Sequence, residues 1–288
     1  MTIVTAFCSS GTGKTTLLIH LAYYCALQGV ETALIELDNR NSLHTCCGLP
    51  ESNFDTSTIF SPEFTGNYSL LPLWEDNLKG KAKVCQAKRD RLLITEQLLS
   101  SKPLGVLKLK QVLQKHPLIQ SLVLLDSPGQ EGIMSSSAIL ASDYVILSIE
   151  PTSKAMNDAI RFVQILYEYE EEYGVEIPEI LGIVVGLYNH EESISRNIMS
   201  QLPGIAEKIG TRLFAPIRYS SEFRNAYSLG LALNMYRPGH EAVKDFFVKG
   251  NLFRGMSEKK IRDLDRNLFE NLPAIGNTLV NLIQKQHG

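Results

Sequence analysis

The sequence predicts an α/β fold in which a doubly wound, mostly parallel sheet is flanked by helices. Short apolar runs rich in β-branched residues alternate with longer stretches of helical periodicity along all 288 residues. The runs are apolar throughout rather than at every second position, which indicates strands buried on both faces. The composition agrees, since 44% hydrophobic and 20% charged residues are typical of a globular domain and exclude a disordered or collagen-like chain.

Six apolar runs have the length and composition of buried strands, and turn-forming residues separate them from the helical stretches. In chain order they are Thr2–Phe7, Thr32–Leu37, Leu118–Leu125, Tyr144–Ile149, Ile180–Gly186 and Arg212–Ile217. A helical pattern over Thr15–Gln28 follows the first strand and ends at Gly29, a common residue after a helix C-terminus. The chain therefore opens with a strand, a glycine-rich loop and a helix.

The remaining segments complete the predicted organisation. Residues 39–70 are rich in Asn, Ser, Thr and Pro, and we expect a surface excursion beside the sheet. The acidic stretch Glu168–Glu179 is interpreted as a solvated helix end, and a helical pattern over Glu258–Gln286 closes the chain. Because no linker or repeat divides the sequence, we predict one domain over residues 1–288, with a helical C-terminal segment at about 239–288.

Charge and cysteine usage narrow the class of protein. With 28 basic and 31 acidic residues the formal net charge is −3, which argues against a uniformly basic nucleic-acid binder but allows local basic patches. The five cysteines are odd in number and show no CxxC or His-linked metal spacing, so we expect a reducing compartment. No apolar run approaches the ~20 residues that span a bilayer. A cytoplasmic protein is therefore expected.

The loop from Cys8 to Thr16, CSSGTGKTT, has the composition of a phosphate-binding loop. Small residues let successive main-chain N–H groups surround phosphate oxygens, and the following helix contributes its positive N-terminal end. The Gly-Lys-Thr sequence supplies Lys14 for the β- and γ-phosphates and the Thr15 hydroxyl for Mg²⁺. The GxxxxGK[ST] pattern departs at Cys8, and a Gly/Ser turn that happens to precede a helix is the alternative. The predicted nucleotide-binding residues of the loop are Ser9, Ser10, Gly11, Thr12, Gly13, Lys14, Thr15 and Thr16.

Two carboxylates come at the ends of predicted strands. Asp38 follows the run TALIEL, and Asp126 follows LIQSLVLL and precedes Ser-Pro-Gly129. The carboxyl ends of parallel strands lie beside the phosphate loop, where carboxylates can hold Mg²⁺ or its waters. We therefore predict a metal site formed by Thr15, Asp38 and Asp126, with the Gly129 N–H near the γ-phosphate. Solvated turns are the alternative for each carboxylate taken alone.

These motifs resemble those of the ParA/MinD family of deviant Walker ATPases. CSSGTGKTT, ALIELDNRNS and LVLLDSPG are similar to the family's nucleotide motifs, and Ile217–Ala242 is similar to the segment after its last core strand. The resemblance runs from about residue 2 to about 248 and implies a P-loop NTPase that hydrolyses ATP with Mg²⁺. It also implies a homodimer that sandwiches ATP. In that comparison Lys14 and Thr15 hold the phosphates and the metal, Asp38 positions the attacking water, and Asp126 holds Mg²⁺ through a water.

One position departs from the family pattern. The family carries a signature lysine that reaches the partner's nucleotide, whereas this chain has Ser9, a feature that resembles the carboxysome-distributing branch. We expect Lys154, just after the Tyr144–Ile149 strand, to supply the missing charge from the partner; a solvent-facing lysine in a helix's first turn is the alternative. Asn189, in the loop after Ile180–Gly186, is predicted to contact adenine, although a surface turn is equally consistent.

Basic residues gather in two stretches. Lys79–Lys110 carries nine basic and two acidic residues, and a solvated face is the simplest interpretation. Thr211–Arg266 carries eleven basic and six acidic residues and overlaps the region where family members present a basic surface to DNA. We predict non-specific binding of double-stranded DNA through phosphates, and hence association with the nucleoid. The candidate phosphate contacts are Arg218, Arg224, Arg237, Lys249 and Arg254. The resemblance also implies an adaptor protein of the ParB/McdB type that links the ATPase to a carboxysome or plasmid cargo.

Two rival functions stay open. A MinD-like membrane-associated ATPase would end in a basic amphipathic helix, but the tail Asn277–Gly288 has only Lys285 as a firm cation, so we expect a buried final helix and no stable membrane anchor. A metabolic P-loop enzyme, such as an ATP-dependent ligase, would need a second substrate pocket. No acidic or histidine cluster in the sequence indicates one.

Overall fold

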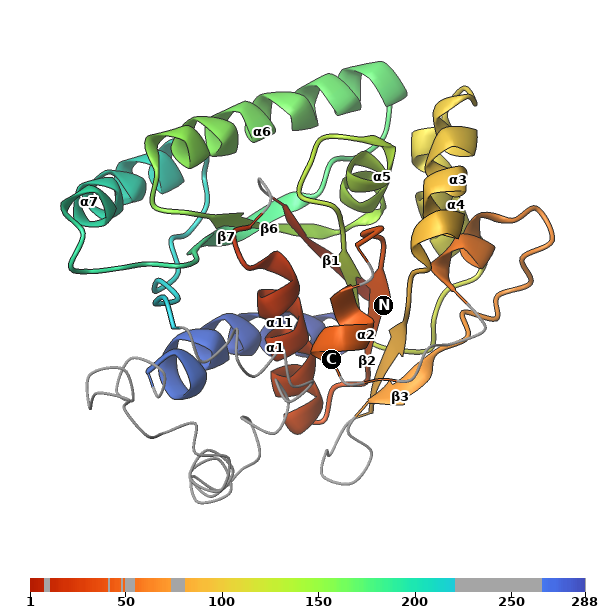
Figure 1. Ribbon diagram of the computed structural model, residues 1–288, viewed down its shortest axis with the longest axis horizontal. Helices are drawn as coiled ribbons and strands as arrows, with labels where there is room; N and C mark the ends of the chain where they lie inside the picture. The colour runs from red at the N-terminus through yellow and green to blue at the C-terminus, as the bar shows by residue number, and fades with distance from the viewer. Residues whose placement is uncertain are drawn as a thin grey trace.

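The computed structural model describes residues 1–7, 11–40, 42–47, 49, 55–73, 81–220 and 266–287. Within them, a seven-stranded sheet has the order β3-β4-β2-β5-β1-β6-β7 (Figure 1). All neighbouring strands are parallel except β3 and β4, which pair antiparallel at one edge. The strands are β1 Thr2–Phe7, β2 Thr32–Glu36, β3 Leu71–Leu73, β4 Ala82–Cys85, β5 Leu122–Asp126, β6 Tyr144–Ile149 and β7 Glu179–Val185.

Helices cover both faces of the sheet, so the prediction of a doubly wound α/β fold is confirmed (Figure 1). On one face, α1 and α11 pack on β1, β5 and neighbouring strands. On the other face lie α3, α4 and α5, and further along the sheet α6 and α7. The α-helices of the described residues are α1 Lys14–Leu27, α2 Ser42–Cys46, α3 Arg89–Ser100, α4 Lys108–Lys115, α5 Ile133–Ala141, α6 Ser153–Tyr173, α7 Ser193–Lys208 and α11 Leu272–His287. The described residues also form two 3₁₀ turns, η1 Thr56–Phe60 and η2 Gly105–Leu107, and one π-helical turn, η4 Asn267–Asn271.

The central strand β5 illustrates why apolar runs predicted this fold. Leu122 and Leu124 belong to the core beneath α1 and α11, whereas Val123 and Leu125 belong to the core beneath α4 and α5. Every residue of β5 is buried. A strand with helices on both faces therefore needs apolar side chains at successive positions.

Two strand predictions were wrong in detail. The predicted run Leu118–Leu125 becomes regular strand only at Leu122 and extends to Asp126. The predicted strand Arg212–Ile217 runs beside β7, with Phe214 N–H donating to Ile183 O (2.9 Å) and Ile217 N–H to Val185 O (2.7 Å), but it forms only isolated bridges. Pro216 has no N–H to donate, so a continuous ladder cannot form there.

The edge of the sheet was missed. β3 follows directly after the turn-rich residues 39–70, and β4 lies within the basic stretch Lys79–Lys110; each strand is only three or four residues long. The described residues between 39 and 70 also lie deeper than a surface excursion, since Leu43, Ile59 and Tyr68 are buried. This part of the chain therefore closes the core beside β2.

The final helix is buried, as predicted. Leu279 and Ile283 of α11 pack into the core beneath α1. A Cβ added at Gly276 would lie 2.2 Å from the Tyr24 ring, so the two helices make close contact at that glycine. The apolar face of α11 thus contacts the sheet rather than solvent. None of the helices in the described ranges is long and apolar enough to cross a membrane. The predicted domain limits, 1–288, and most of the segment from about 239 remain predictions, because 221–265 lie outside the described residues.

Candidate functional site

The phosphate loop turns sharply between β1 and α1. Gly11 and Gly13 have φ angles of 90° and 84°, in the left-handed region that favours glycine. Gly13 is the N-cap of α1, so Lys14 and Thr15 begin the helix at the carboxyl edge of the sheet. The first turn of α1 contains no acidic side chain to neutralise the helix's positive end. Ser9 and Ser10 lie outside the described residues.

Two neighbouring strands press on this loop, and the sequence did not reveal either contact. The buried Ser148, in β6, donates its hydroxyl to Thr12 O at 3.3 Å. At Gly186, just after β7, a Cβ would lie 2.4 Å from the same carbonyl oxygen. A small residue is therefore required at this strand end, because a side chain there would displace the loop.

Lys14, Thr15 and Asp126 converge at the start of α1. The Thr15 hydroxyl lies 3.1 and 3.0 Å from the two carboxylate oxygens of Asp126, to which it donates. Burial raises the pKa of Asp126 to about 8, and the charge of Glu36 acts in the same direction. The Thr15 hydroxyl and the Lys14 ammonium lower that pKa. Burial therefore disfavours the charged form of Asp126, and a cation bound beside it would favour that form.

Asp38 is held at the end of β2 by its own loop. The Arg40 N–H donates to Asp38 Oδ1 at 3.0 Å, and the Arg40 guanidinium lies 4.0 Å from the same oxygen. The start of this loop is fixed by Glu36, a fully buried carboxylate that accepts from Leu43 N–H and Ala87 N–H, each at 2.9 Å. Burial raises the pKa of Glu36 to about 7, while these main-chain donors lower it. Glu36 thus ties α2 and the segment after β4 to the end of β2.

Asp38 and Gly129 line a common cavity of about 290 Å³, together with Glu96 of α3. The sequence had assigned both residues to the γ-phosphate end of a nucleotide, and the structure brings their loops together. Thr15, Asp126 and Asp38 offer oxygen donors, which suit Mg²⁺ because this ion keeps several waters and takes few protein ligands. Among the described residues no group of three or more His, Cys, Asp or Glu side chains forms a protein-only metal cage.

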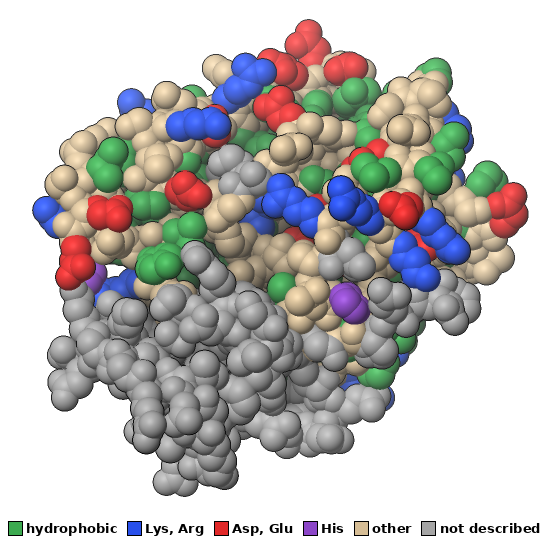
Figure 2. Space-filling model, viewed as in Figure 1, with side chains coloured by type: hydrophobic (Ala, Val, Ile, Leu, Met, Phe, Trp, Pro, Cys, Tyr) green, Lys and Arg blue, Asp and Glu red, His purple; other side chains and the backbone are tan. Residues whose placement is uncertain are grey.

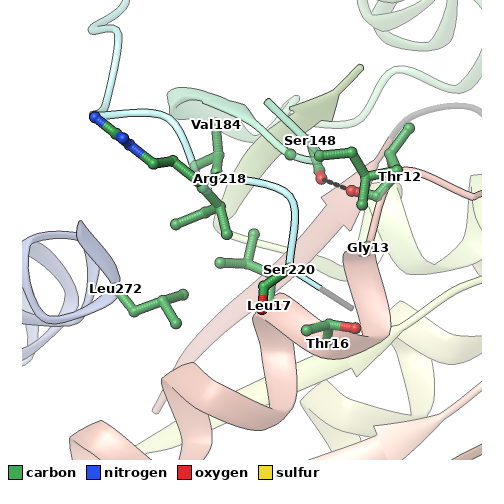
Figure 3. Close-up of a pocket in the computed structure, with 12 residues that line it drawn as sticks. Thr12, Gly13, Thr16, Leu17, Ser148, Val184, Arg218, Ser220 and Leu272 are labelled. Carbon is green, nitrogen blue, oxygen red and sulfur yellow. Dashed lines mark hydrogen bonds between the residues drawn. The ribbon is translucent and has the colours of Figure 1, made fainter. Parts of the chain in front are cut away.

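A second, apolar cavity of about 70 Å³ lies between the phosphate loop and the end of β7 (Figure 3). Thr12 and Gly13 form its wall on the loop side. Facing them are Leu17, Val184, Leu187, Ile217 and Leu272, from four separate parts of the chain. Leu187 has a φ angle of 54°, an uncommon conformation for a branched residue and one found often at binding sites. An apolar cavity next to a phosphate loop can accept a flat ring attached to bound phosphates.

For three predicted residues the structure provides no contact that tests the predicted role. Asn189 is not among the residues lining the apolar cavity; its amide donates to Glu192 at 3.0 Å and accepts from Glu191 N–H at 3.1 Å. Lys154 is exposed in the first turn of α6. Arg218 lines the apolar cavity, but in Figure 3 its guanidinium points away from Thr12 and Gly13. The roles predicted for these residues stay predictions.

On the face shown in Figure 2, the described basic side chains do not form one continuous patch. In Figure 2, Lys and Arg side chains lie among acidic ones across the visible face. Arg91, from the first basic stretch, pairs at 3.0 Å with Asp55, whose side chain is buried, and so has a structural role. Arg224, Arg237, Lys249 and Arg254 lie outside the described residues, so the predicted DNA contacts other than Arg218 have no structural description.

Comparison with known proteins places these features in a family. The model of the CobQ/CobB/MinD/ParA nucleotide binding domain matches residues 3–233. Maintenance of carboxysome distribution protein A of Synechococcus elongatus is 23% identical over 237 residues, which cover 81% of this chain and 91% of that protein. The virulence plasmid ParA family protein pGP5-D of Chlamydia psittaci is 26% identical over 271 residues, which cover 90% of this chain and 95% of that protein.

The solved structures agree in fold. Nucleotide-free McdA of Cyanothece has a TM-score of 0.72 at 19% identity, with 95% of this chain and 98% of that chain covered. The complex of a Cyanothece McdA variant with ATP has a TM-score of 0.67 at 18% identity, with 90% and 98% covered.

Proposed function

The chain belongs to the CobQ/CobB/MinD/ParA nucleotide-binding family, and we propose that it is an ATPase that binds ATP with Mg²⁺ and hydrolyses it to ADP and phosphate. The observation that supports this most directly is the convergence of Lys14, Thr15 and Asp126 at the N-terminus of α1, with Thr15 within hydrogen-bond distance of Asp126. Asp38 and Gly129 border a cavity on the same edge of the sheet.

Each residue has a distinct part in this proposal. The main-chain N–H groups of Gly11 to Thr16 and the Lys14 ammonium bind the phosphates. Thr15 and Asp126 hold Mg²⁺, which when bound neutralises phosphate charge. Asp38 orients the attacking water, and Glu36 keeps the loop of Asp38 in place through its bonds to Leu43 and Ala87.

The missing signature lysine is replaced, in this proposal, by Lys154 of the partner in an ATP-bound homodimer. Lys154 is exposed in the first turn of α6. The helix dipole does not stabilise a cation at this end of a helix, so the position is not explained by the helix itself. The neighbouring Glu150 lies beside the phosphate loop, since a Cβ at Gly11 would lie 3.7 Å from its Oε1. If Lys154→Ala hydrolyses ATP and dimerises like the wild type, this assignment is wrong.

The cellular role proposed is positioning of a cargo. Relatives named for carboxysome distribution and for a plasmid ParA protein support this class. The ATP-bound dimer binds double-stranded DNA non-specifically in the cytoplasm, hydrolysis releases it from the nucleoid, and a ParB/McdB-like adaptor on the cargo speeds hydrolysis. The burial of the α11 apolar face argues against the MinD-like alternative of a membrane-binding tail.

The decisive experiment measures binding to random-sequence DNA with ATP, ADP or no nucleotide across a salt series. Because phosphate contacts release counterions, affinity should fall steeply with salt. Asp38→Ala should stay on DNA longer than the wild type, since it forms the ATP complex but does not turn it over. Equal binding in all three nucleotide states would reject the switch.

A further inference from the structure

The segment 216–220 is held from two sides. On one side, Tyr188 N–H donates to Ile217 O at 3.0 Å and Tyr219 N–H donates to Tyr188 O at 2.9 Å. Successive peptide groups of an extended segment point to alternate sides. The N–H and carbonyl of Arg218 therefore point away from Tyr188, to a side where the described residues provide no further strand.

The side chain of Asn267 pairs with both of these groups. Its Oδ1 accepts from Arg218 N–H at 2.8 Å, and its Nδ2 donates to Arg218 O at 2.8 Å. One turn later, Asn271 Nδ2 donates to Pro216 O at 2.8 Å. Asn267 is fully buried and Asn271 is 7% exposed. A buried amide is stable only when its donors and acceptor are paired, so these asparagines fit this segment and few other partners.

The backbone that carries the pair is also unusual. Asn267 and Asn271 begin and end a π-helical turn, which joins directly to α11. Such turns are rare and occur often at functional sites, because they aim side chains that a regular helix would direct elsewhere.

What the asparagines hold is a wall of the apolar cavity. Ile217, Arg218 and Ser220 line it opposite Thr12 and Gly13, and Leu272, the residue after Asn271, lines it as well (Figure 3). The C-terminal helix thus supplies one side chain to the cavity and fixes the position of the segment beside it.

We propose that Asn267 and Asn271 are positioning residues for a nucleobase, and that they set the width of the apolar cavity in which the base of a bound nucleotide lies. The inference rests on the proposed function, because it needs a nucleotide whose phosphates bind at Lys14. A cavity already formed before binding gains affinity, since the ligand does not have to order the segment. By reciprocity, a bound base stabilises the contact between α11 and residues 216–220.

The test compares two ligands that share the phosphate site but differ in the base. Calorimetry with Mg²⁺ measures the dissociation constants of ATP and of inorganic tripolyphosphate for the wild type and for Asn267→Ala. The wild type should bind ATP more tightly than tripolyphosphate. Asn267→Ala should weaken ATP binding by about tenfold, the loss expected for about 1.4 kcal/mol, and leave tripolyphosphate binding within about twofold.

Matched variants separate positioning from a general loss of structure. Asn281→Ala makes the same substitution at an exposed site of α11 and should leave both dissociation constants unchanged. Asn267→Asp keeps an acceptor for Arg218 N–H but sets a carboxylate oxygen against Arg218 O, so it should weaken ATP binding as well. If Asn267→Ala does not fold, Asn271→Ala decides the question by the same comparison, because it keeps both bonds of Asn267.

Three results would overturn the inference. An unchanged affinity of Asn267→Ala for ATP shows that the cavity does not depend on the asparagine. An equal loss for ATP and tripolyphosphate shows that the effect is structural and not directed at the base. A wild type that binds neither ligand refutes the proposed function together with this inference, whereas the first two results leave the proposed function intact.

Discussion

Two regions meet at the N-terminus of α1, and they are built differently. The phosphate side consists of Gly11 to Thr15 with Asp38 and Asp126, where glycines and charged groups follow strand ends. The base side consists of Val184, Leu187, residues 216–220 and Leu272, where apolar side chains come from distant parts of the chain. On the phosphate side the chemistry lies in the residue types themselves. On the base side the chemistry depends on the positions of main-chain groups and apolar side chains from separate segments, and only the folded chain determines those positions.

The largest expected effect is on the phosphate side. Lys14→Ala removes the ammonium that we propose binds the phosphates, and it should lower ATP turnover by about 100-fold or more, because preorganised charge at a phosphoryl group is worth several kcal/mol. ATP and tripolyphosphate should lose affinity together. Lys285→Ala, at an exposed site of α11, is the matched control and should behave like the wild type. Single-turnover hydrolysis measures the effect. Near-normal turnover of Lys14→Ala would contradict the assignment of this region as the phosphate side.

A smaller effect is expected where a base-side strand touches the phosphate loop. Gly186→Ala places a Cβ 2.4 Å from Thr12 O, so the loop or the strand end must shift, at a cost of about 1–3 kcal/mol in unfolding free energy. Unlike Asn267→Ala, this variant should weaken ATP and tripolyphosphate alike, since the displaced group is the phosphate loop.

The control for that variant is Gly204→Ala in α7, where an added Cβ meets no atom within 4 Å. It should leave ligand binding unchanged and raise stability by about 0.5–1 kcal/mol, as alanine does in a helix. Chemical denaturation and calorimetry give both quantities. If Gly186→Ala weakened ATP binding but not tripolyphosphate binding, this glycine would belong to the base side, and the boundary between the two regions would have to be moved.

The same division explains what the sequence could predict. The strand pattern and the loop CSSGTGKTT predict the sheet and the phosphate side, because glycines in a turn, a lysine at the start of a helix and a strand-end carboxylate each indicate their role from the local sequence. Ser148 and Asn267 could not be found this way. Their partners, Thr12 and Arg218, are 136 and 49 residues away, and nothing in a lone Ser or Asn indicates such a contact. β4 was missed because four residues within a basic stretch carry too short a pattern.

The smallest expected effect concerns α1, which contributes residues to both the phosphate side and the base side. A change in this helix should therefore not distinguish the two sides. Burial lowers the pKa of His20 to about 3, and its ring donates a hydrogen bond to Thr16 O. Well above pH 6.5, as at pH 7.5, the imidazole is almost entirely neutral in both the folded and the unfolded chain, so it contributes almost no pH dependence. Below pH 6.5 the unfolded chain binds a proton that native His20 does not, so the free energy of unfolding falls as the pH falls toward 3.

At pH 6.0 this linkage amounts to about 0.8 kcal/mol, from 1.36 kcal/mol per pH unit. His20→Gln should remove that part of the pH dependence, which urea unfolding of both proteins at pH 7.5 and 6.0 measures as a difference of differences. Other titrating groups are common to both proteins and cancel. Because native His20 stays neutral at pH 6.0, this linkage leaves α1 of the folded protein unchanged, so through His20 the binding of neither ATP nor tripolyphosphate should change. An identical pH dependence of the free energy of unfolding in the two proteins would mean that native His20 accepts the proton, and that α1 tolerates a buried positive charge.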